Sequence, residues 1–117
     1  GILWHQGESD ATMEKIPGYE KNLQDLLSFF RGYSGNPSLP IILGELGSYT
    51  VKEEMRHNWS RINEIIRKTC GTSTLNALVE TGDLKPREDN FHFDGPSQRI
   101  LGQRYAAAFL KSFLQNN

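Results

Sequence analysis

The sequence predicts an α/β fold in which helices cover both faces of a parallel sheet. Three short apolar runs alternate with three longer segments whose apolar residues recur at helical spacing. Strands that alternate with helices are typical of parallel sheets, because each helix returns the chain to the start of the next strand. Open α/β sheets usually have about four to six strands. Three β-α units in 117 residues therefore predict one incomplete domain over residues 1–117, with a complete minimal domain as the alternative.

The first unit opens with the apolar run at residues 2–4, and a polar loop over residues 5–18 follows it. Gly32, Gly35 and Pro37 are expected to end the helix that comes next. The apolar face of that helix is formed by Tyr19, Leu23, Leu26, Leu27 and Phe30.

The second and third units repeat this arrangement. Residues 39–43 are short and β-branched, as in a strand that is buried on both faces, and residues 75–79 form the third run. Gly71 is a plausible end for the second helix, and Pro96 suits the first turn of the third. The expected apolar faces are Val51, Met55, Trp59, Ile62, Ile65 and Ile66 in the second helix, and Ile100, Leu101, Tyr105, Phe109, Leu110 and Phe113 in the third.

Composition argues against several classes of partner. Thirteen basic and fourteen acidic side chains leave a formal net charge of −1, and they form no basic stripe for nucleic acid. No apolar run approaches the roughly 20 residues that a membrane-spanning helix needs. The single cysteine, Cys70, has no Cys or His at metal-ligand spacing. We therefore expect no nucleic acid, membrane, metal or cofactor among the binding partners.

Polar residues follow each apolar run, where parallel sheets usually bind their ligands. Gln6, Gly7 and Glu8 follow the first run, Glu45 follows the second, and a longer loop after the third contains residues 89–92. Because the carboxyl ends of parallel strands meet at one edge of a sheet, we expect these three clusters to converge.

Asp89 and His92 are the most informative pair in these clusters. A carboxylate three residues before a histidine can accept a hydrogen bond from its Nδ1, which leaves Nε2 free as a general base. The spacing alone favours an aspartate that caps a helix and a histidine in a loop over a catalytic pair. The catalytic interpretation of the pair depends on the other motifs in the chain.

Several segments resemble one family. Residues 4–10, Trp-His-Gln-Gly-Glu-Ser-Asp, resemble the Gln-Gly-Glu block of the sialate O-acetylesterase and acetylxylan esterase branch of the SGNH hydrolases. Residues 44–47, 90–94 and 101–105 resemble later segments of the same family, in the same order. The resemblance implies the C-terminal part of a three-layer α/β/α sandwich with a flavodoxin-like parallel sheet. The implied reaction is the hydrolysis of acetyl esters on carbohydrates by a serine, without a metal.

The resemblance also implies roles for individual residues. His92 would be the base and then the acid, Asp89 would orient it, and Gln6 would donate an N–H to the oxyanion. Gly7 would shape that loop at the substrate. Glu8 would assist the histidine, bind the sugar or cap the following helix. Glu45 would bind substrate or have a structural role at the end of its strand.

The nucleophile is where the sequence departs from the family. Its Gly-x-Ser block is not present in residues 1–117, so we expect the serine upstream and the chain alone to be inactive. Ser9 is an alternative nucleophile, since Gly7-Glu8-Ser9-Asp10-Ala11 resembles a nucleophile elbow without its last glycine. A non-catalytic module that binds carbohydrate or a partner is the competing function. A flavodoxin-like module for a small anionic ligand is disfavoured, because the sequence has no Gly-rich phosphate loop.

Overall fold

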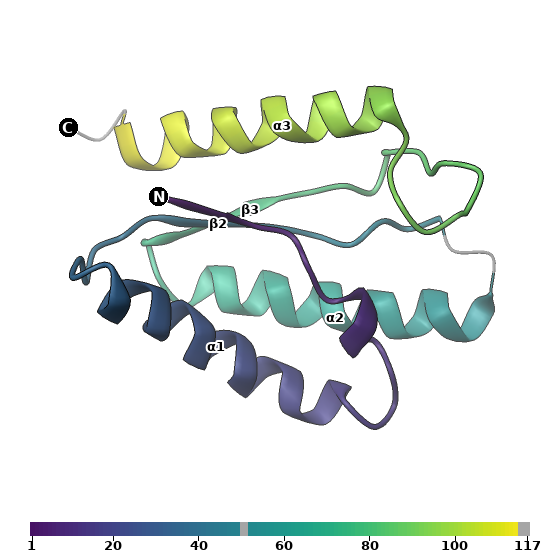
Figure 1. Cartoon of the computed structure of the whole chain (residues 1–117), viewed down its shortest axis with the longest axis horizontal. Helices are drawn as coiled ribbons and strands as arrows, with labels where there is room; N and C mark the ends of the chain where they lie inside the picture. The colour runs from purple at the N-terminus through teal and green to yellow at the C-terminus, as the bar shows by residue number, and fades with distance from the viewer. Residues whose placement is uncertain (50–51, 115–117) are drawn as a thin grey trace.

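The computed structural model describes residues 1–49 and 52–114, and there it shows a three-layer α/β/α sandwich (Figure 1). The sheet contains three parallel strands in the order β1-β2-β3, which are β1 (Ile2–Trp4), β2 (Ile41–Gly44) and β3 (Asn76–Val79). The long helices are α1 (Ile16–Tyr33), α2 (Glu53–Gly71) and α3 (Gly95–Phe109). The predicted fold class is confirmed.

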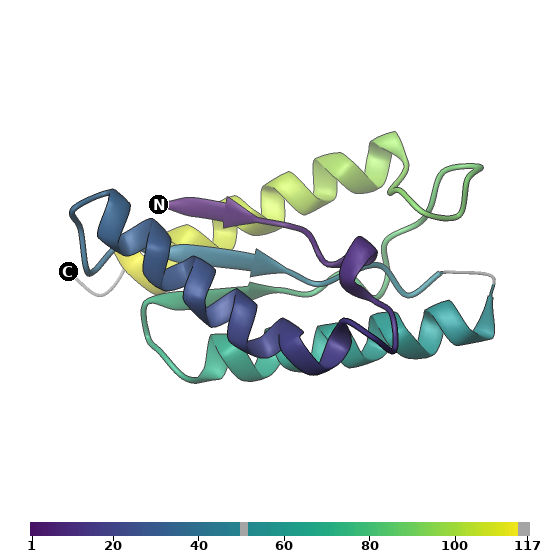
Figure 2. The same cartoon turned by 60° about the horizontal axis from the view of Figure 1, so that its bottom comes forward.

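The order of the strands explains the two helical layers. The chain moves across the sheet in one direction from β1 to β3, and right-handed crossovers then place both connecting helices on the same face. Helices α1 and α2 accordingly lie side by side below the sheet in Figure 1, and α3 lies above it. Figure 2 shows α1 and α2 together in front of the strands.

The central strand β2 is buried on both faces, as its apolar sequence predicts. Ile41 and Leu43 pack into the core between the sheet and helices α1 and α2, whereas Ile42 packs into the core between the sheet and α3. This alternation follows from the two-residue period of a strand. The strand begins at Ile41 and not at Leu39, since Pro40 has no N–H to donate to a ladder. The carbonyl of Pro40 instead accepts a hydrogen bond from the N–H of Ile2, at 2.9 Å.

The helix boundaries differ from the predicted ones mainly near β1. Helix α1 begins at Ile16, three residues before the first predicted apolar residue, and Pro17 occupies its first turn. A short 3-10 turn, η1 (Glu8–Asp10), interrupts the expected loop. Val51, which was expected on the apolar face of α2, lies outside the described residues.

Helix α3 has a well-defined start and an irregular end. Asp94 caps its N-terminus, where Asp94 Oδ1 accepts a hydrogen bond from the N–H of Ser97 at 2.7 Å. Pro96 occupies the first turn, as predicted. A π-helical turn, η2 (Leu110–Leu114), follows directly and continues the apolar face through Phe113. Among the described residues, no helix combines the length and apolar character of a membrane span.

Candidate active site

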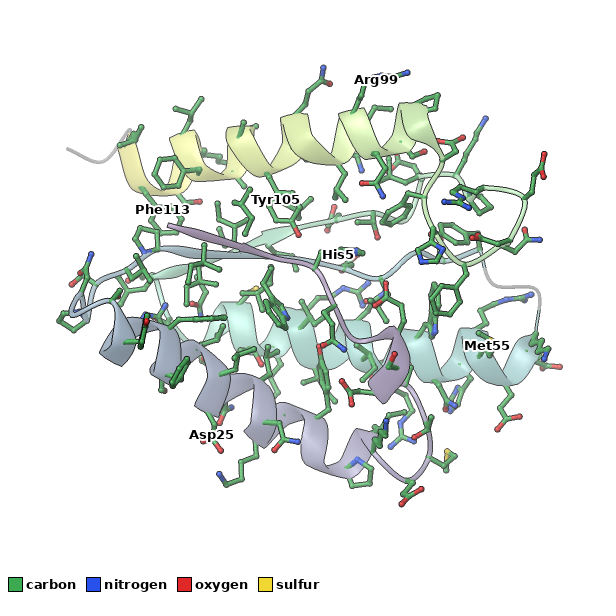
Figure 3. All side chains as sticks on the ribbon, viewed as in Figure 1. His5, Asp25, Met55, Arg99, Tyr105 and Phe113 are labelled. Atoms are coloured by element: carbon green, nitrogen blue, oxygen red, sulfur yellow. The ribbon has the colours of Figure 1, made fainter. Side chains whose placement is uncertain are left out.

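The loops that follow the three strands meet at the right-hand edge of the sheet in Figure 1. His5, just beyond β1, donates a hydrogen bond from Nε2 to the carbonyl of Glu45, at 2.9 Å (Figure 3). Thr81, beyond β3, donates from its hydroxyl to the same carbonyl at 3.2 Å and to that of Leu46 at 2.9 Å. The ring of His5 also lies 5.4 Å from that of Phe93. Buried polar bonds therefore join the three loops behind the site.

Asp89 and His92 form a hydrogen-bonded pair in the loop that leads to α3. Nδ1 of His92 lies 2.8 Å from Oδ2 of Asp89. The other carboxylate oxygen, Oδ1, accepts hydrogen bonds from the N–H groups of Phe91 and His92, at 2.9 and 3.0 Å. The side chain of His92 is 61% exposed, so the ring edge opposite the carboxylate can be reached from solvent.

The protonation of this pair follows from its contacts. The hydrogen bond from His92, together with the backbone N–H groups of His92 and Phe91, holds the pKa of Asp89 well below its usual range. An ionised carboxylate can only accept hydrogen bonds. Nδ1 of His92 therefore carries a proton, and in the neutral ring Nε2 presents a lone pair, as a general base requires.

Backbone hydrogen bonds fix the loop as a tight hairpin, which we call the 86–93 hairpin. Pro86 and Phe93 form an antiparallel bridge at its base. The N–H of Arg87 donates to the carbonyl of His92 at 2.8 Å, and the N–H of Asn90 donates to the carbonyl of Arg87 at 3.0 Å. Asn90 has φ 51°, a left-handed conformation that asparagine tolerates better than most residues. The 86–93 hairpin is therefore closed mainly by backbone hydrogen bonds between its own residues.

We expect the carboxyl of Asp89 to titrate below the ordinary aspartate value of about 3.9. Because its pKa is lowered in the folded state, the pair stabilises the fold above the unfolded pKa. That contribution disappears as the pH falls through the folded pKa. Carbon-13 NMR of the side-chain carboxyls can follow the titration. In a His92→Ala variant the pKa should rise, and an unchanged value would contradict the hydrogen bond.

Gln6 and Gly7 form a second cluster, next to α1. The Gln6 amide donates from Nε2 to Oδ2 of Asp10 at 3.0 Å, and the Tyr19 hydroxyl donates to the carbonyl of Gln6 at 3.0 Å. Gly7 has φ 151°, and a Cβ there would lie 2.9 Å from Cγ2 of Ile62. Only glycine fits this position without displacing its neighbours. An open cavity of about 610 Å³ beside Gln6 and Asp10 has neither Asp89 nor His92 in its lining.

The two predicted glutamates have different surroundings. Glu8 accepts a hydrogen bond at Oε2 from the N–H of Gly7, at 3.1 Å, so it closes the turn at the start of η1. Glu45 is 3% exposed, and its carboxylate accepts a hydrogen bond from Nε of Arg67 at 2.5 Å. The structure thus brings Glu45 into the interface between sheet and α2, and not to an open surface.

Sequence reasoning missed several residues that hold the site together. Arg67 neutralises Glu45, Thr81 ties the loops after β2 and β3, and Tyr49 donates from its hydroxyl to the carbonyl of Phe91 at 3.1 Å. Gly47 was a usable signal for Tyr49, because a Cβ there would overlap the tyrosine ring. In residues 1–49 and 52–114 no group of three or more His, Cys, Asp or Glu side chains is placed to hold a metal ion.

The fold and the site together define a class: a parallel α/β protein with a carboxylate-oriented imidazole at the carboxyl edge of its sheet. The family model of the carbohydrate esterases described as sialic acid-specific acetylesterase matches residues 1–111. The chain belongs to this family, as the sequence motifs predicted.

Comparison with solved structures supports the fold. The X-ray structure of a protein from Arabidopsis thaliana matches with a TM-score of 0.80 and 27% sequence identity. The match covers 97% of this chain and 44% of the other, so the chain spans less than half the length of that protein. No curated protein matches the chain.

Proposed function

We propose that this chain provides the histidine–aspartate pair and an oxyanion donor of an SGNH-type carbohydrate O-acetylesterase, with the nucleophilic serine in a segment upstream. The observation that carries the proposal is the Asp89–His92 pair, whose imidazole has a protonated Nδ1 and an exposed Nε2. Membership of a carbohydrate esterase family supports ester hydrolysis as the reaction in which this pair would act.

The imidazole would act as base and then as acid twice, once in acylation and once in deacylation. The serine oxygen attacks the acetyl carbonyl, and its proton passes to Nε2 of His92. His92 then gives this proton to the sugar oxygen as the bond to the acetyl group breaks. Water attacks the acyl-enzyme, again losing a proton to Nε2, and acetate leaves while the serine regains its proton. Asp89 stays ionised and stabilises the imidazolium throughout.

Gln6 can serve as the oxyanion donor without giving up its contact with Asp10. A side-chain amide has two N–H bonds, and Asp10 accepts only one of them. Tyr19, which binds the carbonyl of Gln6, and the buried Gly7, which follows it, hold the backbone that carries this amide. A preorganised donor of this kind is what stabilises a developing oxyanion.

The outer edge of β1 supports an upstream contribution. β1 is the last strand on its side of the described sheet, and its residue Leu3 is 60% exposed. An aromatic row leads away from this edge: Trp4 lies 5.9 Å from Phe30, and Phe29 and Tyr33 continue outward on α1. In the described sheet β1 pairs with β2 on one side only, and an edge strand with exposed apolar neighbours is suited to pairing with a further strand.

The proposal is tested with the chain joined to its natural upstream sequence. This longer protein should release acetate from O-acetylated sugars and from p-nitrophenyl acetate, and a fluorophosphonate probe should label a serine upstream of Gly1. A Ser9→Ala variant is the matched control and should keep its activity, because Ser9 lies in an exposed turn and no described hydrogen bond joins its hydroxyl to His92. Sugar binding without hydrolysis, measured by calorimetry, would favour the non-catalytic module, and labelling of Ser9 would refute the upstream nucleophile.

A further inference from the structure

Tyr49 contacts the residues on both sides of His92. Its hydroxyl donates a hydrogen bond to the carbonyl of Phe91 at 3.1 Å. Its ring meets that of Phe93 edge-on, with the two centroids 5.4 Å apart. Tyr49 comes from the loop after β2, so these contacts attach the 86–93 hairpin to the central strand of the sheet.

The hairpin is anchored by its two phenylalanines, which flank His92 in the chain. Phe91 packs edge-on against Trp59 of α2, with centroids 5.3 Å apart, and Phe93 packs against His5. Phe93 is 3% exposed, whereas the side chain of His92 is 61% exposed. The ring of Phe91 also meets that of His92 edge-on, with the two centroids 5.1 Å apart, so the anchored phenylalanines support the exposed imidazole.

The surroundings of Tyr49 keep its hydroxyl a donor. Burial raises the pKa of Tyr49, and the negative charges of Glu8, Asp89 and Asp94 raise it further. These carboxylates come from η1 and from the loop before α3, which places Tyr49 where the loops of the site meet. Replacing Tyr49 by phenylalanine removes a single oxygen atom. The hydrogen bond to Phe91 is then lost, while the packing on Phe93 remains.

We infer that Tyr49 is a positioning residue for the Asp89–His92 pair, acting through its hydrogen bond to Phe91 and its packing on Phe93. The inference rests on the proposed function for its consequence, since a positioned imidazole matters to a reaction in which His92 is the base. The geometry itself is independent of that reaction. No described hydrogen bond or ring contact joins Tyr49 to the imidazole or the carboxylate, so its effect is on how often the hydrogen bond between Asp89 and His92 is formed.

The test measures the tautomer of His92 in the 117-residue chain by long-range proton–nitrogen NMR. His5 and His57 are the only other histidines and serve as internal references. In the wild-type chain, neutral His92 should be mainly the Nδ1–H tautomer. Tyr49→Phe should lower the ratio of Nδ1–H to Nε2–H by about 2- to 10-fold, the equilibrium equivalent of one ordinary hydrogen bond. Tyr33→Phe is the matched control, because Tyr33 is 85% exposed on α1, and it should leave the ratio unchanged.

The outcomes separate this inference from the proposed function. An unchanged ratio in Tyr49→Phe would overturn the positioning role whether or not the longer protein is an esterase. A changed ratio in a protein that hydrolyses no ester would support the positioning role and refute the proposed function. Where the longer protein is active, Tyr49→Phe should lower kcat with little change in KM. Tyr49→Ala, with folding checked by circular dichroism, should show a larger change in the tautomer ratio than Tyr49→Phe.

Discussion

Replacing His92 by alanine should lower kcat for acetyl ester hydrolysis by roughly 10⁴- to 10⁶-fold in the longer protein. Without the imidazole, no group holds the serine proton as the tetrahedral intermediate forms, and none returns it to the sugar oxygen. The residual rate would come from the oxyanion donors and substrate binding. His57→Ala is the matched control, because His57 is exposed on α2, and its rate should equal that of the wild type.

Asp89→Asn separates the orientation of the imidazole from its presence. The asparagine keeps the size of the side chain, but its amide can donate to Nδ1, which favours the tautomer with the proton on Nε2. The base is then blocked, and kcat should fall by about 10⁴-fold. Residues that act as one unit are not additive, so the double variant should be no slower than His92→Ala. Retention of more than a tenth of the activity by either single variant would place the base elsewhere in the protein.

The sequence predicted the parts of the fold that depend on local periodicity. β2 was recognised because a run of branched apolar residues suits a strand buried on both faces, and Ile41, Ile42 and Leu43 are indeed almost completely buried. η1 and the early start of α1 were missed. η1 begins directly after Gly7, and no local pattern encodes the unusual φ of this glycine or its close approach to Ile62, which is 55 positions away in the chain.

In the site, too, the local contact was predicted from the sequence and the long-range contact was missed. Asp89 and His92 are three residues apart, so their contact was readable as a local motif. Tyr49 and Phe91 are 42 positions apart, and their contact requires that the loop after β2 meets the 86–93 hairpin. Glu45 was predictable only in part. It is the second residue after Leu43, so its side chain continues the face of β2 that packs against α1 and α2. Strand alternation could have predicted its burial, but not its pairing with Arg67.

Gly44→Ala should have the largest effect on the stability of this chain, at about 3 kcal/mol. A Cβ at Gly44 would overlap the hydroxyl of Tyr105 and lie 3.0 Å from Cδ2 of His5. That hydroxyl is buried and donates to the carbonyl of Trp4 at 2.8 Å, where Tyr105 reaches from α3 to the sheet (Figure 3). Urea unfolding followed by circular dichroism measures the change. Gly102→Ala is the matched control: its Cβ meets nothing within 4 Å, and it should stabilise α3 by about 0.5–1 kcal/mol.

A double-mutant cycle identifies the atom responsible for the Gly44 effect. Tyr105→Phe alone should cost about 1–2 kcal/mol, because the carbonyl of Trp4 loses its partner. In that background the added methyl no longer meets a hydroxyl, so Gly44→Ala should cost at least about 1 kcal/mol less than in the wild type. Strictly additive losses would instead assign the clash to His5. That ring binds the carbonyl of Glu45 and packs on Phe93, so displacing it would loosen the 86–93 hairpin as well. The close approach of Tyr105 to the sheet therefore requires a glycine at position 44, and the neighbouring His5 connects this position to Phe93 of the hairpin.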